Sequence, residues 1–409
     1  MPANPTRNAA FDLLAAVLDR RRALDDALDA LPQMDPRDRA AAHRLAAAAL
    51  RRLGTLDAVL EDFVSREPPA PVRHLLRLGA ADLLLLGTPA HAAVATLVDL
   101  ARARGLPKFA GLINAVLRKV AAGGPALLEG LDGPKLDTPS WLWGSWGAEA
   151  RVIAEAHQHE APLDLTLRPG AAAPDGGVTL PTGTLRFPPG TRVTDLPGYA
   201  EGAFWVQDAA AALPASLLAA RPGERIADLC AAPGGKTAQL AAAGAAVTAV
   251  EKDSRRIARL RENLARLRLD AEIVEADATR WQPGVLFDAV LLDAPCSSTG
   301  TIRRHPDIPH HKRPRGIAAL TATQDALLAA ALRLVRPGGR VIYAVCSLQP
   351  EEGATRIAAT GLAHDAFRKE ELPGLPEGIS NQGFLRTHPG LWADRGGMDG
   401  FFAARLVRP

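Results

Sequence analysis

The first part of the chain places apolar residues at the three-to-four spacing of amphipathic helices. One such face carries Phe11, Leu14, Val17 and Leu18. The same spacing recurs over residues 36–53, 55–65, 71–86, 90–104 and 108–121, and Pro36, Pro71 and Pro107 stand near the expected helix starts. This part shows no cluster of reactive side chains. We predict an all-α domain of short packed helices over residues 1–125.

A segment rich in glycine and proline follows, and the pattern then changes. Residues 126–139 are expected to form a linker. A helix with three tryptophans is expected from about residue 140 to His159, and residues 163–167 alternate apolar and polar side chains as a strand does. We predict a small α+β subdomain over residues 140–206.

From residue 207 to the end, short apolar runs alternate with helical patterns. Strands are expected at 226–229, 246–250, 272–275, 289–292 and 341–345, and helices at 236–243, 254–268 and 320–335. This alternation predicts a parallel sheet with helices on both faces, a doubly wound, Rossmann-like α/β domain over residues 207–409. Such sheets bind ligands beyond the carboxyl ends of their strands.

A loop of small residues follows the first of these strands, and acidic residues end the strands after it. The loop comprises Cys230, Ala231, Ala232, Pro233, Gly234, Gly235 and Lys236. Its spacing is neither that of a P-loop nor G-x-G-x-x-G, which disfavours a dinucleotide. Glu251, Asp277 and Asp293 end successive strands. Glu251 suits the ribose hydroxyls and Asp277 an adenine amino group, and the acids together suit a cationic cofactor; a tight turn with ordinary surface acids is the alternative. These residues predict a site for a nucleoside that carries a sulfonium.

All three cysteines lie at expected strand ends of this α/β domain. Cys296 and Cys346 end strands that should be neighbours in the sheet, so both thiols should face the cofactor cleft. For Cys230 we favour the simpler interpretation of a small buried side chain that shapes the loop.

Four long motifs resemble the RsmB/Nop/Sun family of RNA 5-methylcytosine methyltransferases. They are DLCAAPGGKT (228–237), FDAVLLDAPCSSTGTIRRHPDI (287–308), YAVCSLQPEE (343–352) and GMDGFFAARL (397–406). The helical part resembles NusB-like RNA-binding domains, through INAVLRKV (113–120) among other fragments. The resemblance implies S-adenosylmethionine as cofactor and transfer of a methyl group to carbon 5 of a cytosine in small-subunit (16S) ribosomal RNA.

This chemistry needs a thiol, because carbon 5 of cytosine becomes nucleophilic only after a thiolate adds to carbon 6. The residues alone leave both cysteines open for that role. By analogy with the Pro-Cys motif of DNA cytosine methyltransferases Cys296 is favoured, whereas the family resemblance implies Cys346 as nucleophile and Cys296 in product release. Asp293, if protonated, is expected to donate a hydrogen bond to the N3 edge of the cytosine ring. Lys236 is expected either to help orient the site or to be an ordinary surface lysine at a helix start. Glu251 stands where the family usually has Asp.

Basic residues crowd into the stretch that follows Cys296, although the net charge is only +3. We expect Arg303, Arg304, His305, Lys312 and Arg313 to lie at the cleft mouth and to contact RNA phosphates. A zinc site at His305, His310 and His311 is disfavoured because no cysteine or paired carboxylate accompanies them, and we expect no metal. A solvated surface is the alternative for this stretch.

Composition argues against membrane, secreted and disulfide-bonded classes of protein. No uninterrupted apolar run long enough for a membrane span is expected, and the N-terminal residues show no signal peptide. Three cysteines make a disulfide framework unlikely to form, which points to the cytoplasm, and we expect a monomer. The alternatives are the same chemistry on transfer RNA or another ribosomal site, a non-catalytic NusB-like assembly factor and, least favoured, a dinucleotide oxidoreductase.

Overall fold

The structure, a computed structural model, describes residues 4–409 in two compact units. Of the described residues, one unit contains 4–159 together with 302–313, and the other contains 160–301 and 314–409. Residues 1–3, part of the N-terminal stretch in which no signal peptide is expected, lie outside the described residues. The short segment 302–313 therefore belongs to the first unit although its neighbours in the chain belong to the second.

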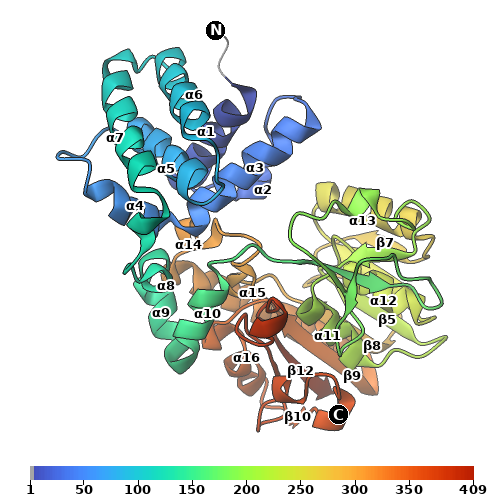
Figure 1. Cartoon of the computed structure of the whole chain (residues 1–409). Coiled ribbons are helices and arrows are strands. Elements are labelled where there is room, and N and C mark those ends of the chain that lie inside the picture. Colours follow the sequence, from blue (N-terminus) through green and yellow to red (C-terminus); the bar gives the residue numbers. More distant parts are fainter. Residues whose placement is uncertain (1–3) are drawn as a thin grey trace. The chain divides into compact units, whose positions relative to one another are not determined.

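The first unit is all-helical, as predicted (Figure 1). Asn4 and Asp35 cap the first and third helices by accepting hydrogen bonds from Arg7 N and Arg37 N, and a proline follows each cap. The helices are α1 (Pro5–Leu18), α2 (Leu24–Asp29), α3 (Pro36–Arg51), α4 (Leu53–Glu61), α5 (Ala70–Leu84), α6 (Ala90–Ala103), α7 (Ala110–Gly123), α8 (Gly133–Asp137), α9 (Ser140–Trp146), α10 (Ala150–Ala156) and α14 (Ile308–His311).

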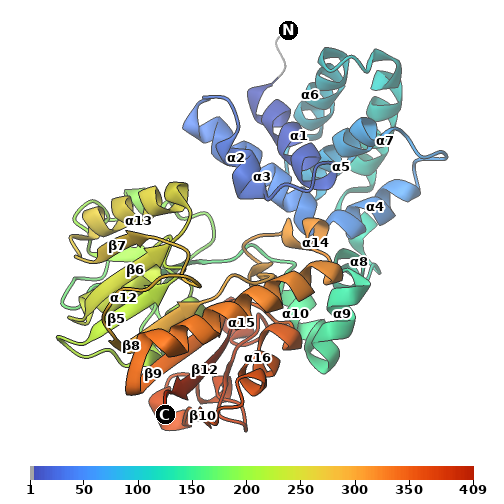
Figure 2. The same cartoon turned by 180° about the vertical axis from the view of Figure 1, so that it is seen from behind.

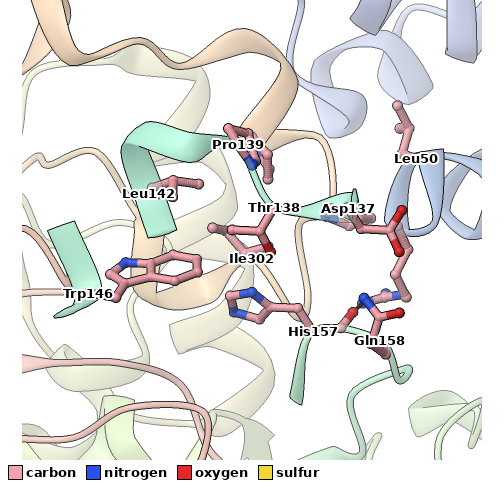
Figure 3. Close-up of a pocket in the computed structure, with 12 residues that line it drawn as sticks. Leu50, Asp137, Thr138, Pro139, Leu142, Trp146, His157, Gln158 and Ile302 are labelled. Carbon is pink, nitrogen blue, oxygen red and sulfur yellow. Dashed lines mark hydrogen bonds between the residues drawn. The ribbon is translucent and has the colours of Figure 1, made fainter. Parts of the chain in front are cut away.

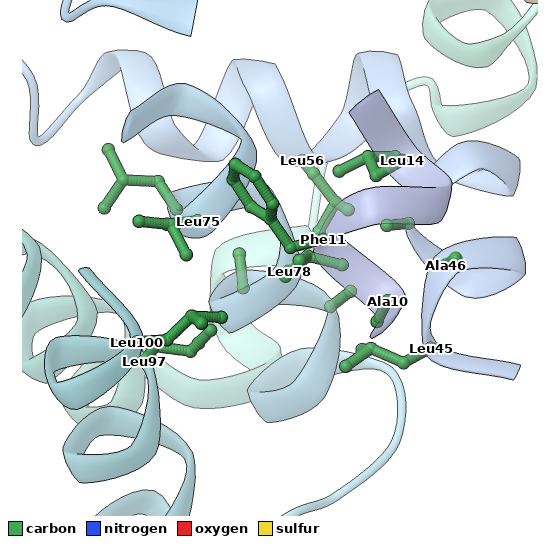
Figure 4. Packing of buried hydrophobic residues seen from close by; sticks show 14 of the residues in the cluster. Ala10, Phe11, Leu14, Leu45, Ala46, Leu56, Leu75, Leu78, Leu97 and Leu100 are labelled. Carbon is green, nitrogen blue, oxygen red and sulfur yellow. The ribbon is translucent and has the colours of Figure 1, made fainter. Parts of the chain in front are cut away.

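The apolar faces of these helices meet in one core, and Figure 4 shows part of it. Phe11 and Leu14 of α1 point toward residues of α3, α4, α5 and α6. The labelled members of this cluster are Ala10, Phe11, Leu14, Leu45, Ala46, Leu56, Leu75, Leu78, Leu97 and Leu100. The three-to-four spacing in the sequence therefore marks the residues that this unit buries.

The tryptophan-rich helix expected over residues 140–159 is interrupted. Gly147 has a φ of 57°, which ends α9, and α10 begins at Ala150. Both helices belong to the first segment of the first unit, which extends to His159. The segment expected to be a linker contains part of the 3-10 helix Gly124–Leu128 and all of α8. The domains 1–125, 140–206 and 207–409 stay a prediction.

The second unit begins with a small antiparallel sheet in the order β2-β3-β1-β4. Leu165, Leu185, Phe187 and Phe204 form its apolar side. On the other side of β1, the buried Asp164 receives two hydrogen bonds of 2.7 Å from Arg186 of β3. The strands are β1 (Leu163–Leu167), β2 (Val178–Thr179), β3 (Leu185–Phe187) and β4 (Phe204–Val206).

The larger sheet has the order β10-β12-β9-β8-β5-β6-β7, with β11 paired to β12. The five strands expected from the sequence pair in parallel, and β8 and β9 are neighbours as predicted. The antiparallel addition of β12 beside β9 was not predicted. The strands are β5 (Arg225–Leu229), β6 (Ala246–Glu251), β7 (Glu272–Glu275), β8 (Phe287–Asp293), β9 (Val335–Val345), β10 (His364–Asp365), β11 (Leu385–Arg386) and β12 (Phe402–Val407).

Helices cover both faces of this sheet because its buried strands are apolar on both sides. On one face, Ile226, Ala289 and Ile342 pack against α11 and α12. On the other, Val290 and Tyr343 pack against α15, which lies along β8 and β9 in Figure 2. The helices are α11 (Ala209–Leu218), α12 (Gly235–Ala242), α13 (Ser254–Leu267), α15 (Ile317–Leu334) and α16 (Ala354–Ala359).

One helix has the length and hydropathy of a membrane span, although the sequence analysis expects none. Residues 314–334, which include α15, are long and apolar enough to cross a membrane. Leu327, Leu328, Ala331 and Leu334 of this helix are buried against the sheet. In this structure the apolar run forms part of the core of the α/β unit.

Candidate active site

The carboxyl ends of the central parallel strands open into a cavity of about 600 Å³. A cavity of this size suits a small-molecule ligand. Residues after β5, β6, β7, β8 and β9 line it, as expected for a doubly wound sheet. Among them are Cys230, Glu251, Lys252, Arg256, Asp277, Asp293, Cys296, Ser298, Leu327 and Cys346.

Two cysteines meet at one side of this cavity. The sulfur atoms of Cys296 and Cys346 lie 3.4 Å apart, because β8 and β9 are neighbours and each cysteine follows its strand closely. A hydrogen bond from Cys296 lowers the pKa of Cys346, helped by Ser298 and Lys236, although burial and Asp293 oppose the shift. The same hydrogen bond, together with burial, raises the pKa of Cys296 well above its usual value. The pair therefore favours a Cys346 thiolate held by a Cys296 thiol.

Lys236 and Asp293 form an ion pair beside the two thiols. The Nζ atom of Lys236 lies 2.7 Å from Oδ2 of Asp293. Burial acts to lower the pKa of Lys236, but the negative charges around it, Asp293 first among them, raise this pKa overall. Asp293 therefore accepts a hydrogen bond from Lys236 through Oδ2, and its role as a protonated donor stays a prediction. Lys236, expected in the cofactor loop, directs its ammonium group to this pair.

The expected cofactor residues lie around the cavity. Glu251 Oε1 accepts hydrogen bonds from Lys252 N and Asp253 N, and Arg256 forms a 2.9 Å ion pair with Oε2. That buried Oε2 atom has no hydrogen-bond partner among the described residues. Asp277 is exposed, and hydrogen bonds from Thr279 lower its pKa.

The loop after β5 combines a strained backbone with a tight helix start. Cys230 has a φ of 62°, and burial raises the pKa of its thiol to about 12, so Cys230 is not an activated nucleophile. Gly234 has a φ of 105°, and a Cβ atom there would lie 2.5 Å from Leu260 of α13. Ala231, Ala232, Pro233 and Gly235 complete this turn, from which α12 begins.

Two further acids in this unit were not predicted. Asp228 of β5 is fully buried and accepts a 2.6 Å hydrogen bond from Thr237, and burial raises its pKa to about 7. Glu352 is fully buried behind the cysteine loops and accepts hydrogen bonds from Ser297 and Ser347. In the sequence Glu352 cannot be distinguished from its exposed neighbour Glu351, because both follow the same Pro350.

The C-terminal motif joins the same loops through a close backbone contact. Gly400 N donates a 2.8 Å hydrogen bond to Gly300 O, and Gly300 N donates one to Cys346 O. A Cβ atom on Gly300 would lie 1.9 Å from Gly400 O. Glycine is therefore required at residue 300 for the motif at 397–406 to pack against the cysteine loops.

The basic stretch after Cys296 belongs largely to the helical unit. Arg303 is 2% exposed, so the structure does not present it to an RNA phosphate as expected. Arg51 donates a hydrogen bond to its carbonyl oxygen, and His310 contacts Leu50 O. In Figure 1 the orange α14 lies beside the blue and green helices. The roles of the half-buried Arg304, His305, Lys312 and Arg313 in RNA binding stay a prediction.

The histidines of this stretch have separate partners: His305 pairs with Asp25, His310 with Leu50 O and His311 with Asp307. Over residues 4–409, no group of three or more His, Cys, Asp or Glu is placed to hold a metal ion.

The helical unit has a small cavity of about 20 Å³ (Figure 3). Leu142, Trp146, His157 and Ile302 line it, and the rings of Trp146 and His157 meet edge to face. Burial lowers the pKa of His157 to about 3, so this histidine is neutral. Because the cavity has room for about one water molecule, we exclude it as a substrate site.

Comparisons with known proteins agree with these two units. Residues 215–407 match the family described as 16S rRNA methyltransferase RsmB/F, and residues 4–122 match the NusB family. The chain is 37% identical over 433 residues to ribosomal RNA small subunit methyltransferase B of Xanthomonas campestris pv. campestris, with 98% of this chain and 97% of that protein covered.

Two solved structures share the fold. The crystal structure of PH0851 has a TM-score of 0.74 at 22% identity and covers 100% of this chain and 99% of that one. A methyltransferase homolog protein from Pyrococcus horikoshii has a TM-score of 0.52 at 25% identity and covers 68% of this chain and 96% of that one. With a near full-length relative at 37% identity, the chain belongs to the RsmB/F family of methyltransferases, with a NusB-type helical domain before the catalytic one.

Proposed function

We propose that this enzyme methylates carbon 5 of a cytosine in small-subunit ribosomal RNA, with S-adenosylmethionine as donor and Cys346 as nucleophile. The observation that carries the proposal is the thiol pair: two sulfur atoms 3.4 Å apart at the cavity, with the pKa of Cys346 lowered and that of Cys296 raised. The similarity to the ribosomal RNA small subunit methyltransferase B of Xanthomonas campestris supports the substrate class.

The residues of the cavity fit S-adenosylmethionine. A volume of about 600 Å³ accommodates a nucleoside with an amino-acid tail. The buried Oε2 of Glu251 lacks a hydrogen-bond partner among the described residues, which suits a ribose hydroxyl. Asp277 would accept from the adenine amino group, and the loop from Cys230 to Lys236 would surround the tail. When bound, this cofactor supplies an electrophilic methyl group.

The Cys346 thiolate adds to carbon 6 of cytosine, which breaks the ring conjugation and gives carbon 5 the character of an enamine. Carbon 5 then takes the methyl group. Loss of the proton from carbon 5 and expulsion of the Cys346 thiolate from carbon 6 restore the aromatic ring. The complete cycle therefore returns the Cys346 thiolate with which the reaction began.

Cys296 serves product release in this proposal. Once Cys346 sulfur is bonded to carbon 6, it no longer accepts the proton of Cys296. The interaction that raised the pKa of Cys296 most is then lost, so Cys296 can release its proton to water. The resulting thiolate accepts the proton from carbon 5.

In this proposal, Lys236 of the ion pair takes the donor role expected from the sequence for a protonated Asp293. Lys236 donates toward the ring edge, where negative charge builds up when the thiolate adds. Asp293 holds the ammonium group 2.7 Å away and can accept from the cytosine amino group. We expect Lys236→Met to lower the rate of methyl transfer about 100-fold, as the loss of an oxyanion-hole donor does.

RNA binding is proposed for the helical unit and for the half-buried residues Arg304, His305, Lys312 and Arg313. Replacing Lys312 and Arg313 by Gln should weaken RNA binding. The slope of the logarithm of the binding constant against the logarithm of the salt concentration should fall by about one for each residue replaced. With ribosomal RNA as its substrate, we place the enzyme in the cytoplasm.

A mechanism-based RNA tests the covalent step. RNA with 5-fluorocytosine should form an adduct that resists denaturation, because fluorine cannot leave as the proton does. Cys346→Ala should abolish this adduct, whereas Cys296→Ala should let an adduct accumulate on ordinary RNA. The reverse pattern would exchange the two roles.

A second test identifies the substrate. Bisulfite sequencing of total RNA from a deletion strain should show one lost 5-methylcytosine in small-subunit ribosomal RNA. Loss in transfer RNA or at another ribosomal site would favour that alternative, and no loss would favour a non-catalytic assembly factor.

A further inference from the structure

Glu352 lies in the core of the second unit behind the two cysteine loops. Its carboxylate accepts four hydrogen bonds: Oε1 from Ser297 N at 2.9 Å and Gln324 Nε2 at 3.0 Å, and Oε2 from the hydroxyl groups of Ser297 and Ser347 at 2.5 Å each. The residue is 0% exposed, and Tyr343 donates a 2.7 Å hydrogen bond to its carbonyl oxygen. With four donors directed at it, the group acts as an ionised acceptor.

The donors belong to the residues next to the two thiols. Ser297 follows Cys296 after β8, and Ser347 follows Cys346 after β9. Gln324 of α15 also donates a 3.0 Å hydrogen bond to the carbonyl of Pro295, the residue before Cys296. One buried carboxylate therefore joins the two cysteine loops, in addition to the direct hydrogen bonds from Gly300 N to Cys346 O and between the hydroxyl groups of Ser297 and Ser347.

Hydrogen bonds to an ionised group inside a protein are short and about twice as strong as neutral ones. They are also directional, so they fix the rotation of each loop as well as its distance from the other. The 3.4 Å separation of the sulfur atoms depends on both. Glu352 itself does not line the cavity, so it acts on the reaction only through the cysteines.

We propose that Glu352 is a positioning residue that holds Cys296 and Cys346 at hydrogen-bond distance by binding Ser297 and Ser347. The inference rests on the proposed function of the thiol pair. Removal of this carboxylate separates the thiols, raises the fraction of protonated Cys346 and slows methyl transfer while the fold and the cofactor site remain.

Glu352→Gln is the sharpest variant. An amide placed with its NH₂ group at Oε1 would face the fixed N–H of Ser297 and the NH₂ group of Gln324, which a second hydrogen bond to Pro295 O holds in place. Placed at Oε2, the NH₂ group faces two hydroxyl groups that can rotate and accept. The variant therefore keeps its volume and its contacts with Ser297 N and Gln324, but it replaces the two short bonds to the carboxylate with weaker, neutral bonds that the amide donates to the two serines. Glu351→Gln is the matched control, because Glu351 is the adjacent residue and is exposed.

The decisive measurement needs no RNA. Diamide takes two electrons and two protons from a pair of thiols and leaves a disulfide, at a rate that reports how closely the sulfur atoms are held. We expect Glu352→Gln to slow Cys296–Cys346 disulfide formation about tenfold, in line with the loss of hydrogen bonds to a charged group. Urea unfolding and binding of labelled S-adenosylmethionine should show a folded protein with an intact cofactor site, and Glu351→Gln should match the wild type.

Methyl transfer to ribosomal RNA provides the second measurement. The kcat of Glu352→Gln should fall about 100-fold, the effect of a displacement of about 1 Å, with the KM values for RNA and cofactor within about twofold of the wild type. If kcat and the disulfide rate both stay at wild-type values, or if Glu351→Gln slows both equally, the inference is overturned.

Two further outcomes separate this inference from the proposed function. If the wild type transfers no methyl group to RNA but only Glu352→Gln slows the disulfide, the proposed function fails and the positioning role stands. If Glu352→Gln does not fold, Ser297→Ala decides: it removes one hydroxyl donor and keeps the backbone hydrogen bond. A slower disulfide in Ser297→Ala supports the inference, and an unchanged rate overturns it.

Discussion

Asp307 Oδ2 accepts a 3.0 Å hydrogen bond from the backbone N–H of Leu24, a residue 283 positions earlier in the chain. This bond caps the first turn of α2, which has no side-chain cap of its own. Asp307 is 3% exposed and also lies 3.3 Å from His311. A segment encoded after Cys296 thus completes the helical unit.

Asp307→Ala should therefore destabilise the protein by about 2 kcal/mol, the upper range for loss of a helix cap. The reason is that Leu24 N would be left buried without its acceptor. Urea unfolding followed by circular dichroism measures the change. Asp29→Ala on the same helix is the control, because its ion pair with Arg39 is exposed and should contribute at most about 0.5 kcal/mol. Equal losses in the two variants would contradict the capping role.

The two thiols should react with different pH dependence. Iodoacetamide should alkylate Cys346 with a midpoint below the usual cysteine range, because Cys296 donates to its sulfur. Cys296→Ala removes that donor, so the midpoint for Cys346 should move to higher pH. Mass spectrometry of each cysteine peptide follows the reaction. An unchanged midpoint in Cys296→Ala would mean that Cys296 does not activate Cys346.

Asp228 should make stability depend on pH near neutrality. Burial raises its pKa from 3.8 to about 7, so the native state holds its proton more tightly than the unfolded state. The contribution of Asp228 to the free energy of unfolding is therefore fully present below pH 3.8. It is lost as the pH rises toward about 7, and the loss amounts to at most roughly 4 kcal/mol.

Asp228→Asn should make the free energy of unfolding less dependent on pH in this range, because the amide does not titrate. Its oxygen can still accept the hydrogen bond from Thr237. Urea unfolding at pH 5 and at pH 8 gives the comparison. The exposed Asp270→Asn should keep the wild-type slope. If Asp228→Asn keeps it as well, Asp228 does not carry the pH dependence.

Gly300→Ala should disrupt the cysteine loops. Its new Cβ atom would lie 1.9 Å from the backbone oxygen of Gly400, which cannot move as a flexible side chain does. We expect a loss of about 3 kcal/mol, in the range of severe overpacking, together with loss of methyl transfer. Gly316→Ala is the control, because nothing lies within 4 Å of a Cβ atom there. A Gly300→Ala protein with normal stability and activity would show that the loops tolerate separation.

The all-α and the α/β fold could be predicted from the sequence, because the local spacing of apolar residues indicates which side chains are buried. A spacing of three to four predicted α1 and α3 to α7 of the first unit, but not the short α2, α8 and α14. Short apolar runs predicted the five parallel strands. The motifs around Cys230, Cys296 and Cys346 located the site, since residues after parallel strands meet at one edge of the sheet. The match to the RsmB/F family agrees with that interpretation.

Tertiary structure alone decided which charged residues are buried and what each one contacts. Glu351 and Glu352 are identical in the sequence, yet only Glu352 meets the loops of both cysteines. Arg303 was expected to contact RNA but is buried, and the ion pair of Asp293 with Lys236 could not be read from the sequence. Hydrophobic periodicity is a local property of the chain. The environment of a charge depends instead on partners brought from distant positions, and no local pattern records them.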